Sequence, residues 1–181
     1  ASPGCSSTRP RQTSATVDTD GLTLQDLADI DWAYDQIDSK AGKDRQVEVP
    51  LSIVDGEFHE IMHGTADCAC GAELWDAKFG RGEHDYTPQI QSYALGWMQR
   101  HGLTRLRCYV LRAALRRVDV IDVEYDEAMA AVTAIVARVG QGERCPSDFC
   151  SWCDAHLTCS AVNERVQAVA KGREDWEPIT Y

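Results

Sequence analysis

The sequence lacks a long apolar run and is short of positive charge. No stretch approaches the ~18 consecutive apolar residues that a membrane-spanning helix needs, so we expect no membrane segment. With 18 Lys and Arg against 29 Asp and Glu, the formal net charge is −11. That balance argues against a protein that coats nucleic acid by bulk electrostatics, because such proteins are usually basic. It leaves room for an enzyme with a local basic groove.

Cysteine, in contrast, is abundant, with eight in 181 residues. A disulfide scaffold suits small secreted chains with thin cores, whereas a chain of this length can bury a core without cross-links. Clustered cysteines in a mid-sized chain without a secretory signal pattern more often indicate a metal site. We therefore expect a cytoplasmic protein that binds a metal through some of its cysteines.

The apolar periodicity predicts one compact α/β domain. It divides into a polar arm (1–20), a core (21–144) and a cysteine-rich module with a C-terminal helix (145–181). Pro50 favours an edge position for the first strand, because proline cannot donate to a strand ladder. The expected helices are 21–42, 87–100, 126–139 and 161–171, and the expected strands are 46–53, 60–70, 72–80, 106–114 and 118–125.

The first helix shows an amphipathic pattern. This pattern predicts that its apolar side chains form the face that packs on the core. The residues are Leu22, Leu24, Leu27, Ile30, Trp32, Tyr34 and Ile37.

Two carboxylates and a lysine gather in the hairpin predicted around Gly71. Asp76 and Lys78 are two residues apart on a strand and share a face, and strand pairing can bring Asp67 beside them. Converging carboxylates next to a lysine make an oxygen-rich pocket suited to Mg²⁺ or Mn²⁺, which can polarise a phosphodiester. The alternative is a solvated hairpin with an exposed ion pair, the commoner meaning of Asp-x-Lys in isolation.

The next predicted helix carries Gln89 and Tyr93, four residues apart on one face. An amide and a phenol there can hydrogen-bond a phosphate or a catalytic lysine. The alternative is a packed tyrosine beside a surface glutamine.

Near the C-terminus, Cys150, Cys153 and Cys159 form a C-x2-C-x5-C pattern. Two thiolates separated by two residues can chelate one centre from a single turn, and the third can close around it. Zinc and a [4Fe–4S] cluster both need a fourth ligand, and spacing alone does not separate them. The alternative is a disulfide that leaves one of the three cysteines unpaired.

Six arginines lie between Arg100 and Arg117. Arg105 and Arg107 share one face of the expected strand, and Arg112 takes the other. Guanidinium groups suit phosphate contacts, but a solvated face paired with nearby carboxylates is an equally good interpretation.

Four motifs in a fixed order resemble the PD-(D/E)xK nuclease superfamily, specifically its RecB-like exonuclease branch. The segments LWDAKFGRG and TPQIQSYALG are similar to that branch's V-I-D-Y-K-x-G-x-G and N-P-Q-L-x-x-Y-A-L-G. The resemblance covers roughly residues 20–160 and implies a restriction-endonuclease-like core, a mixed central sheet flanked by helices. The motifs are Gly64-x-x-Asp67, Asp76-x-Lys78, Gly80 and Gln89-x-x-x-Tyr93.

The resemblance also implies roles for these residues. Asp67 and Asp76 would bind Mg²⁺ or Mn²⁺ together with the Ala77 carbonyl, and Lys78 would be the catalytic lysine, with the glutamine–tyrosine pair completing the site. The branch has a histidine ligand on its N-terminal helix, and Gln25 stands at the matching position here. Its neutral amide oxygen can still reach a metal ion or the water bound to it, so Gln25 is a candidate metal ligand.

A subset of RecB-like nucleases, including AddB-type recombination nucleases and CRISPR-adaptation nucleases, ends in C-x2-C-x5-C and adds one upstream cysteine. In that subset the four thiolates hold a structural [4Fe–4S] cluster. The resemblance therefore implies Cys5 with Cys150, Cys153 and Cys159 as ligands, and Cys145 is the rival for the fourth position. Zinc is the alternative metal.

The function implied is a metal-dependent exonuclease acting on linear single- or double-stranded DNA, in recombination or DNA-end processing. We expect it in the cytoplasm of a bacterial or phage-infected cell, with a recombination or helicase partner or as a homo-oligomer. One alternative is a weakly active or inactive nuclease-fold subunit that binds DNA or a partner. Another is a small zinc-ribbon interaction protein.

Overall fold

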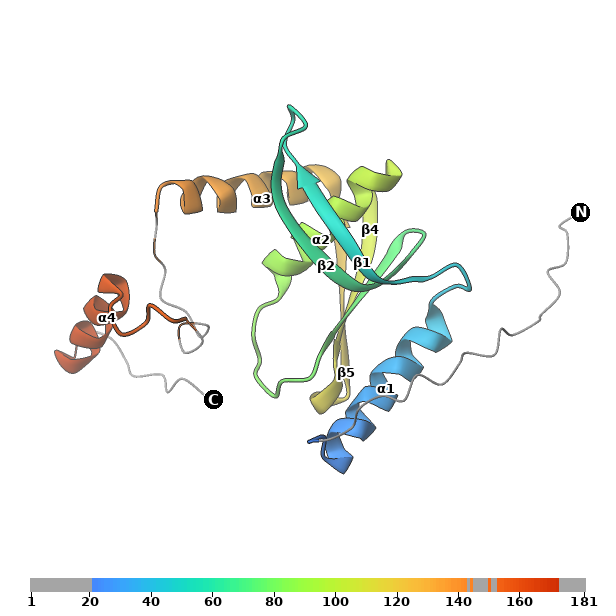
Figure 1. The fold of residues 1–181 in the computed structure, drawn as a ribbon, viewed down its shortest axis with the longest axis horizontal. Helices are drawn as coiled ribbons and strands as arrows, with labels where there is room; N and C mark the ends of the chain where they lie inside the picture. The colour runs from blue at the N-terminus through green and yellow to red at the C-terminus, as the bar shows by residue number, and fades with distance from the viewer. Residues whose placement is uncertain (1–20, 143, 145–149, 151–152, 173–181) are drawn as a thin grey trace, which may run out of the picture.

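The computed structural model describes residues 21–142, 144, 150 and 153–172. Within them the chain forms a five-stranded mixed sheet with helices on both faces (Figure 1). The expected α/β class with a mixed, helix-flanked sheet is confirmed. In chain order the elements are α1 (Leu24–Lys40), β1 (Gln46–Val54), β2 (Glu60–Cys70), β3 (Glu73–Lys78), α2 (Thr87–His101), β4 (Arg105–Arg112), the 3-10 turn η1 (Ala113–Leu115), β5 (Arg117–Glu124), α3 (Tyr125–Gly140) and α4 (Ser160–Ala170).

Strand order follows the sequence, from β1 at one edge to β5 at the other. Neighbouring strands are antiparallel except for β3 and β4, which are parallel. Gly71 turns β2 into β3 with a φ of 56°, a left-handed conformation that glycine adopts without strain. Pro50 lies on the edge strand β1, as the sequence predicts.

The parallel pair requires a crossover, because parallel strands cannot be joined by a tight turn. The segment that crosses contains α2, which leaves β3 after Lys78 and returns to β4 at Arg105. In the resulting register, Lys78 stands opposite Arg112. The two cations therefore lie side by side at the ends of two strands.

Two apolar clusters cover the two faces of the sheet. On one face, α2 and α3 pack against Leu74 of β3 and Leu106 and Val110 of β4. On the other face, α1 packs against Trp75 and Leu111. The alternation of Leu74 and Trp75 follows from the period of two in a strand. Successive side chains of β3 therefore point to opposite faces of the sheet, and those of Asp76 and Lys78 point toward the face that α2 covers.

The buried face of α1 agrees with the expected one in part, because Trp32 and Ile37 pack against the apolar cluster on that face of the sheet. Leu24 is 87% exposed and Ile30 is 40% exposed, whereas Asp29 and Ala33 are buried. An ion pair explains the difference, because Asp29 Oδ1 lies 2.9 Å from Arg116 Nη2, just beyond η1. A buried carboxylate needs such a partner, and this pairing fixes the rotation of α1 about its axis.

No helix in the described part of the chain has the length and apolarity to span a membrane.

We expect Gly96→Ala to lower the free energy of unfolding by about 1–3 kcal/mol, the usual effect of overpacking. A Cβ at Gly96 would lie 3.2 Å from Leu51 Cβ and 3.4 Å from the Ser52 carbonyl oxygen, so the added methyl would push α2 away from β1. Urea unfolding measures the change.

The matched control is Gly140→Ala at the end of α3, where a Cβ meets nothing within 4 Å. It should be neutral or stabilising by up to ~1 kcal/mol, through helix propensity alone. Equal effects of the two substitutions would contradict the close packing of α2 on β1.

Candidate functional site

Asp76 and Lys78 form a largely buried ion pair on the central strand β3. Asp76 is only 2% exposed, and Lys78 Nζ lies 2.7 Å from Asp76 Oδ2. Among the described residues no well-aligned hydrogen bond reaches that oxygen, so its stabilisation is ionic. The apolar neighbours therefore enclose the pair, and the interpretation as an exposed ion pair is wrong.

Burial dominates the electrostatics of Asp76. Desolvation raises the pKa of its carboxyl above the ordinary value, further than Lys78 lowers it, and the nearby charge of Asp67 adds to the rise. The negative charge of the Asp76 carboxylate is therefore only partly compensated by Lys78. The site thus favours an additional cation, or a proton, at Asp76.

Asp67 reaches the same place from the neighbouring strand β2. Its Oδ2 accepts a hydrogen bond from the backbone N–H of Ala77, at 2.6 Å. Ala77 lies between Asp76 and Lys78, so this bond ties Asp67 to the centre of the Asp-x-Lys motif. The structure therefore brings together Asp67, Asp76, Ala77 and Lys78, as the sequence predicts.

Gln89 and Tyr93 pair on α2, and Tyr93 packs on β2. Gln89 Nε2 donates to Tyr93 Oη at 2.9 Å. The Tyr93 ring lies directly over Gly64, where a Cβ would come 2.7 Å from Tyr93 Cε1. Gly64 is thus the position that lets α2 approach β2, so two of the predicted motifs are in direct contact.

Sequence reasoning missed Tyr86, and it identified Arg112 only as one of six clustered arginines, not as a neighbour of Lys78. The Tyr86 ring centroid lies 4.8 Å from Lys78 Nζ and 5.0 Å from Arg112 Cζ, so one ring faces both cations. Tyr86 directly precedes α2, and its carbonyl accepts from the N–H of Ile90. The strand register that places Arg112 beside Lys78 is not visible in the sequence. No sequence signal therefore identified the cluster of Lys78, Tyr86 and Arg112.

The structure gives Gln25 a partner on its own helix. Gln25 Nε2 donates to Asp29 Oδ1 at 2.7 Å, and Asp29 in turn pairs with Arg116. Its proposed role as a metal ligand stays a prediction. Across the described residues, no three His, Cys, Asp or Glu side chains come together as a metal-binding group.

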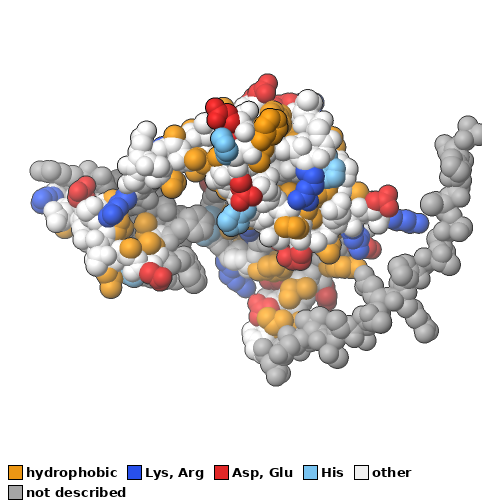
Figure 2. Space-filling view, turned by 45° about the horizontal axis from the view of Figure 1, so that its top comes forward, with side chains coloured by type: hydrophobic (Ala, Val, Ile, Leu, Met, Phe, Trp, Pro, Cys, Tyr) orange, Lys and Arg blue, Asp and Glu red, His pale blue; other side chains and the backbone are white. Residues whose placement is uncertain are grey.

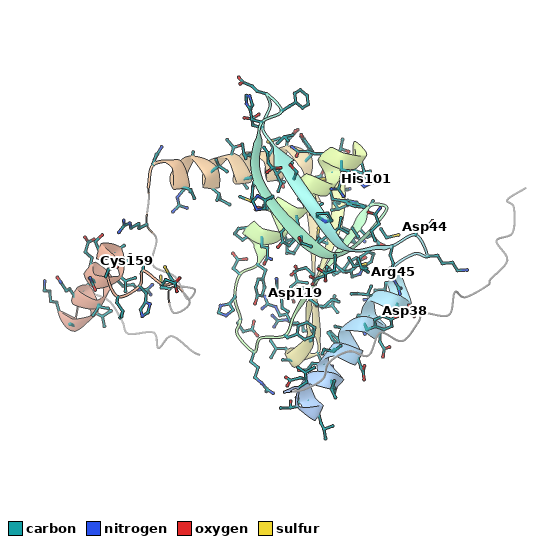
Figure 3. The ribbon with its side chains drawn as sticks, in the orientation of Figure 1. Asp38, Asp44, Arg45, His101, Asp119 and Cys159 are labelled. Atoms are coloured by element: carbon teal, nitrogen blue, oxygen red, sulfur yellow. The ribbon has the colours of Figure 1, made fainter. Side chains whose placement is uncertain are left out.

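The cysteine module is described only in part. Cys5 and Cys145 lie outside the described residues, Cys150 is half-buried, and Cys153 and Cys159 are not joined in a disulfide. The Cys153 N–H donates to the Cys150 carbonyl at 3.2 Å, so the backbones of the first two cysteines lie close together. The N–H groups of Val162 and Ala161 lower the pKa of the Cys159 thiol, which precedes α4 (Figure 3). A lowered pKa favours the thiolate form that binds metals.

The exposed arginines of β4 pair with carboxylates of β5. Arg105 Nε lies 2.7 Å from Glu124, and Arg107 Nε lies 2.8 Å from Asp122. On the face shown in Figure 2, Lys and Arg side chains are scattered among Asp and Glu side chains. Of the two interpretations of these arginines, the paired surface agrees with the structure.

Comparison with known proteins gives a family and one fold-level likeness. A family described as "Protein of unknown function (DUF2800)" matches residues 28–178. None of the curated proteins compared with the chain matches it. A solved structure titled "Crystal structure of SSO0001" is 13% identical, covering 75% of this chain and 69% of that one, with a TM-score of 0.46. That score is too low to assign a shared fold.

The raised pKa of Asp76 predicts a pH-dependent stability. Because the folded pKa lies above the ordinary 3.8, the folded state favours the protonated carboxyl. This contribution is fully present below the unfolded pKa and is lost as pH rises through the folded pKa. In metal-free buffer, we therefore expect wild-type protein to lose stability relative to Asp76→Asn as pH rises from the ordinary carboxyl value of 3.8 through the folded pKa of Asp76. Denaturant unfolding at a series of pH values measures the difference.

Asp122→Asn is the control with the opposite sign. The hydrogen bond from Arg107 lowers the pKa of Asp122, so its contribution is present above the unfolded pKa and is lost as pH falls through the folded pKa. A pH-independent difference between wild type and Asp76→Asn would contradict the buried, uncompensated carboxyl.

Proposed function

Because this chain belongs to the DUF2800 family, whose description names no activity, we propose its function from the site itself. We propose that the chain is a metal-dependent deoxyribonuclease with a PD-(D/E)xK-type site formed by β2, β3 and α2. The observation that carries the proposal is the buried oxygen of Asp76, which has Lys78 as its ion-pair partner and lies in the cluster that includes Asp67. A buried strand carboxylate whose negative charge is only partly compensated, next to a lysine, suits metal-assisted phosphodiester hydrolysis.

The donor set fits a hard divalent cation. Asp67, Asp76 and the Ala77 carbonyl offer oxygen ligands, and Mg²⁺ is commonly held by one or two carboxylates together with substrate phosphates. Such an ion would act as a Lewis acid and activate a water molecule when bound. The carboxylates of Asp67 and Asp76 are therefore sufficient for the metal site that we propose.

The chain's own residues would then orient the reaction. The ammonium of Lys78 is held by Asp76 and by the face of Tyr86, so it is fixed where charge develops on a phosphate. The Gln89–Tyr93 pair provides polar groups at the α2 side of the site. Positioning of this kind contributes to catalysis because the donors need no reorganisation during the reaction.

We propose linear DNA, single- or double-stranded, as the substrate, with exonuclease action in recombination or end processing. Because the exposed arginines Arg105 and Arg107 of β4 pair with carboxylates of β5, they form no continuous basic track there, so a helicase or recombination partner, or a second copy, would help to deliver the DNA.

We also propose a structural [4Fe–4S] cluster, with Cys150, Cys153 and Cys159 among its ligands and Cys5 or Cys145 as the fourth. The hydrogen bond from the Cys153 N–H to the Cys150 carbonyl and the lowered pKa of the Cys159 thiol support it. Zinc is the alternative occupant of the same thiolates.

One observation favours a second candidate, a nuclease-fold subunit with little or no activity. Gln25, at the position of the expected histidine ligand, bonds to Asp29 rather than to the carboxylates of the site. Such a subunit would bind DNA or a partner without cutting.

We expect Mg²⁺ or Mn²⁺ to support degradation of linear DNA, and Lys78→Ala to lower the rate by about 100-fold or more, as loss of one transition-state donor does. Electrophoresis of end-labelled single- and double-stranded DNA, with and without chelator, measures the activity. Lys43→Ala, which removes an exposed lysine between α1 and β1, is the matched control. No metal-dependent degradation, or equal degradation by Lys78→Ala, would contradict the enzyme and favour the inactive subunit.

Anaerobically purified protein should contain iron and acid-labile sulfide and absorb visible light. Cys153→Ala should lose both, because it removes a thiolate that the cluster requires. Cys70→Ala, which removes a half-buried cysteine of the sheet, should keep both. Zinc without iron would contradict the cluster and support a zinc site.

A further inference from the structure

We propose that Arg112 is a positioning residue that holds the β3–α2 loop (residues 79–86) and thereby fixes Tyr86 against Lys78. This inference rests on the proposed function, because it assigns Arg112 a part in setting up the same site. Arg112 ends β4 and stands opposite Lys78 in the parallel register. It is 8% exposed, which is unusual for an arginine unless it is paired.

The contacts of Arg112 point into the loop rather than toward solvent. Arg112 Nη2 donates to the His84 carbonyl at 2.8 Å, and Nη1 donates to the Gly82 carbonyl at 3.3 Å. Its Cζ lies 5.0 Å from the Tyr86 ring centroid. One guanidinium thus contacts three residues of the β3–α2 loop.

Asp119 of β5 fixes the guanidinium from the other side. Asp119 Oδ2 accepts from Arg112 Nε at 2.6 Å, and Asp119 Oδ1 lies 2.9 Å from Arg117 Nε (Figure 3 labels Asp119). Arg117 also pairs with Glu83 of the loop, at 2.9 Å. Partial burial acts to raise the pKa of Asp119, but the bonds from both arginines lower it overall, so the carboxylate stays charged.

These contacts indicate that Arg112 does not itself bind phosphate. Each of its three nitrogen atoms already donates to a protein oxygen, and the side chain is nearly inaccessible. Replacing those bonds with bonds to a phosphate would release the loop. The role of Arg112 is therefore to position other residues, whereas Lys78 and the carboxylates would contact the substrate and the metal ion.

The loop that Arg112 holds joins the two halves of the proposed site. Its first end follows Lys78 on β3, and its last residue, Tyr86, begins the turn into α2, which carries Gln89 and Tyr93. A Cβ at Gly82 would lie 2.4 Å from the His84 ring, so a larger residue there would require the His84 side chain to move. Fixing the middle of the loop therefore fixes the distance between the Asp-x-Lys strand and the Gln-x-x-x-Tyr helix.

The experiment compares Arg112→Lys and Arg112→Ala with wild type. Lysine keeps the buried charge opposite Asp119 but cannot reach three acceptors at once. We expect Arg112→Lys to lower kcat on linear DNA by about 10-fold to 100-fold, with KM and Tm little changed, because a displaced group slows the reacting step. Hydrogen exchange of the amides of residues 79–86 should become faster in both variants, and this readout does not depend on activity.

Arg105→Lys is the matched control, since Arg105 lies on the same strand with its side chain 69% exposed and paired with Glu124. It should alter neither kcat nor exchange in the loop. Unchanged loop exchange in Arg112→Lys would overturn the proposal, as would unchanged kcat where wild-type protein cuts DNA, or equal effects of Arg105→Lys. Loss of folding in Arg112→Ala alone leaves Arg112→Lys to decide.

The two proposals can fail separately. If wild-type protein does not cut DNA, the proposed function fails, and loop exchange in Arg112→Lys still tests whether Arg112 holds the loop. If wild-type protein cuts DNA and Arg112→Lys cuts equally well, the positioning role fails while the nuclease stands.

Discussion

The parallel pairing of β3 with β4 is the constraint on which the rest of the molecule depends. Parallel neighbours cannot be joined by a hairpin, so the chain must cross over, and the crossover is α2. The same pairing puts the ends of the two strands side by side, with Lys78 opposite Arg112. One strand orientation therefore supplies both the helix that brings Tyr93 to β2 and the cation that stands beside the lysine. The antiparallel strands on either side extend this unit.

The second organising feature is the treatment of buried charge. Asp29, Asp76 and Arg112 are all nearly inaccessible, and each lies beside an opposite charge. Two of these pairs join separate elements, α1 to the chain after η1 and β4 to β5. Breaking a buried pair is expensive because it leaves one charge without compensation. In Asp76 the compensation is incomplete, since burial outweighs the pull of its lysine, and this incompleteness distinguishes the candidate site from the pairs that only hold the fold.

Much of the fold was predictable, because periodicity and turn residues are local signals. The hairpin at Gly71, the edge position of Pro50 and the shared face of Asp76 and Lys78 all follow from the order of residues in the chain. On α1, the packing of Trp32 and Ile37 was predicted, but the burial of Asp29 was not, because its partner Arg116 lies far along the sequence. The positions of Tyr86 and Arg112 next to Lys78 were not predicted for the same reason, since the register between β3 and β4 is set by tertiary packing. Cys5 and Cys145 lie outside the described residues, and their roles stay predictions.

The ion pairs across β4 and β5 bear on how DNA would meet this surface. Arg105 and Arg107 already have carboxylates of the same chain as neighbours. A phosphate that docks there must exchange places with Glu124 or Asp122, and the freed carboxylate then attracts a cation from solution, which offsets the counterion that the phosphate releases. The salt dependence of DNA binding reflects how many such ions are released. Contacts made by exchange at these arginines would therefore give a shallower slope with salt than the number of arginines alone suggests.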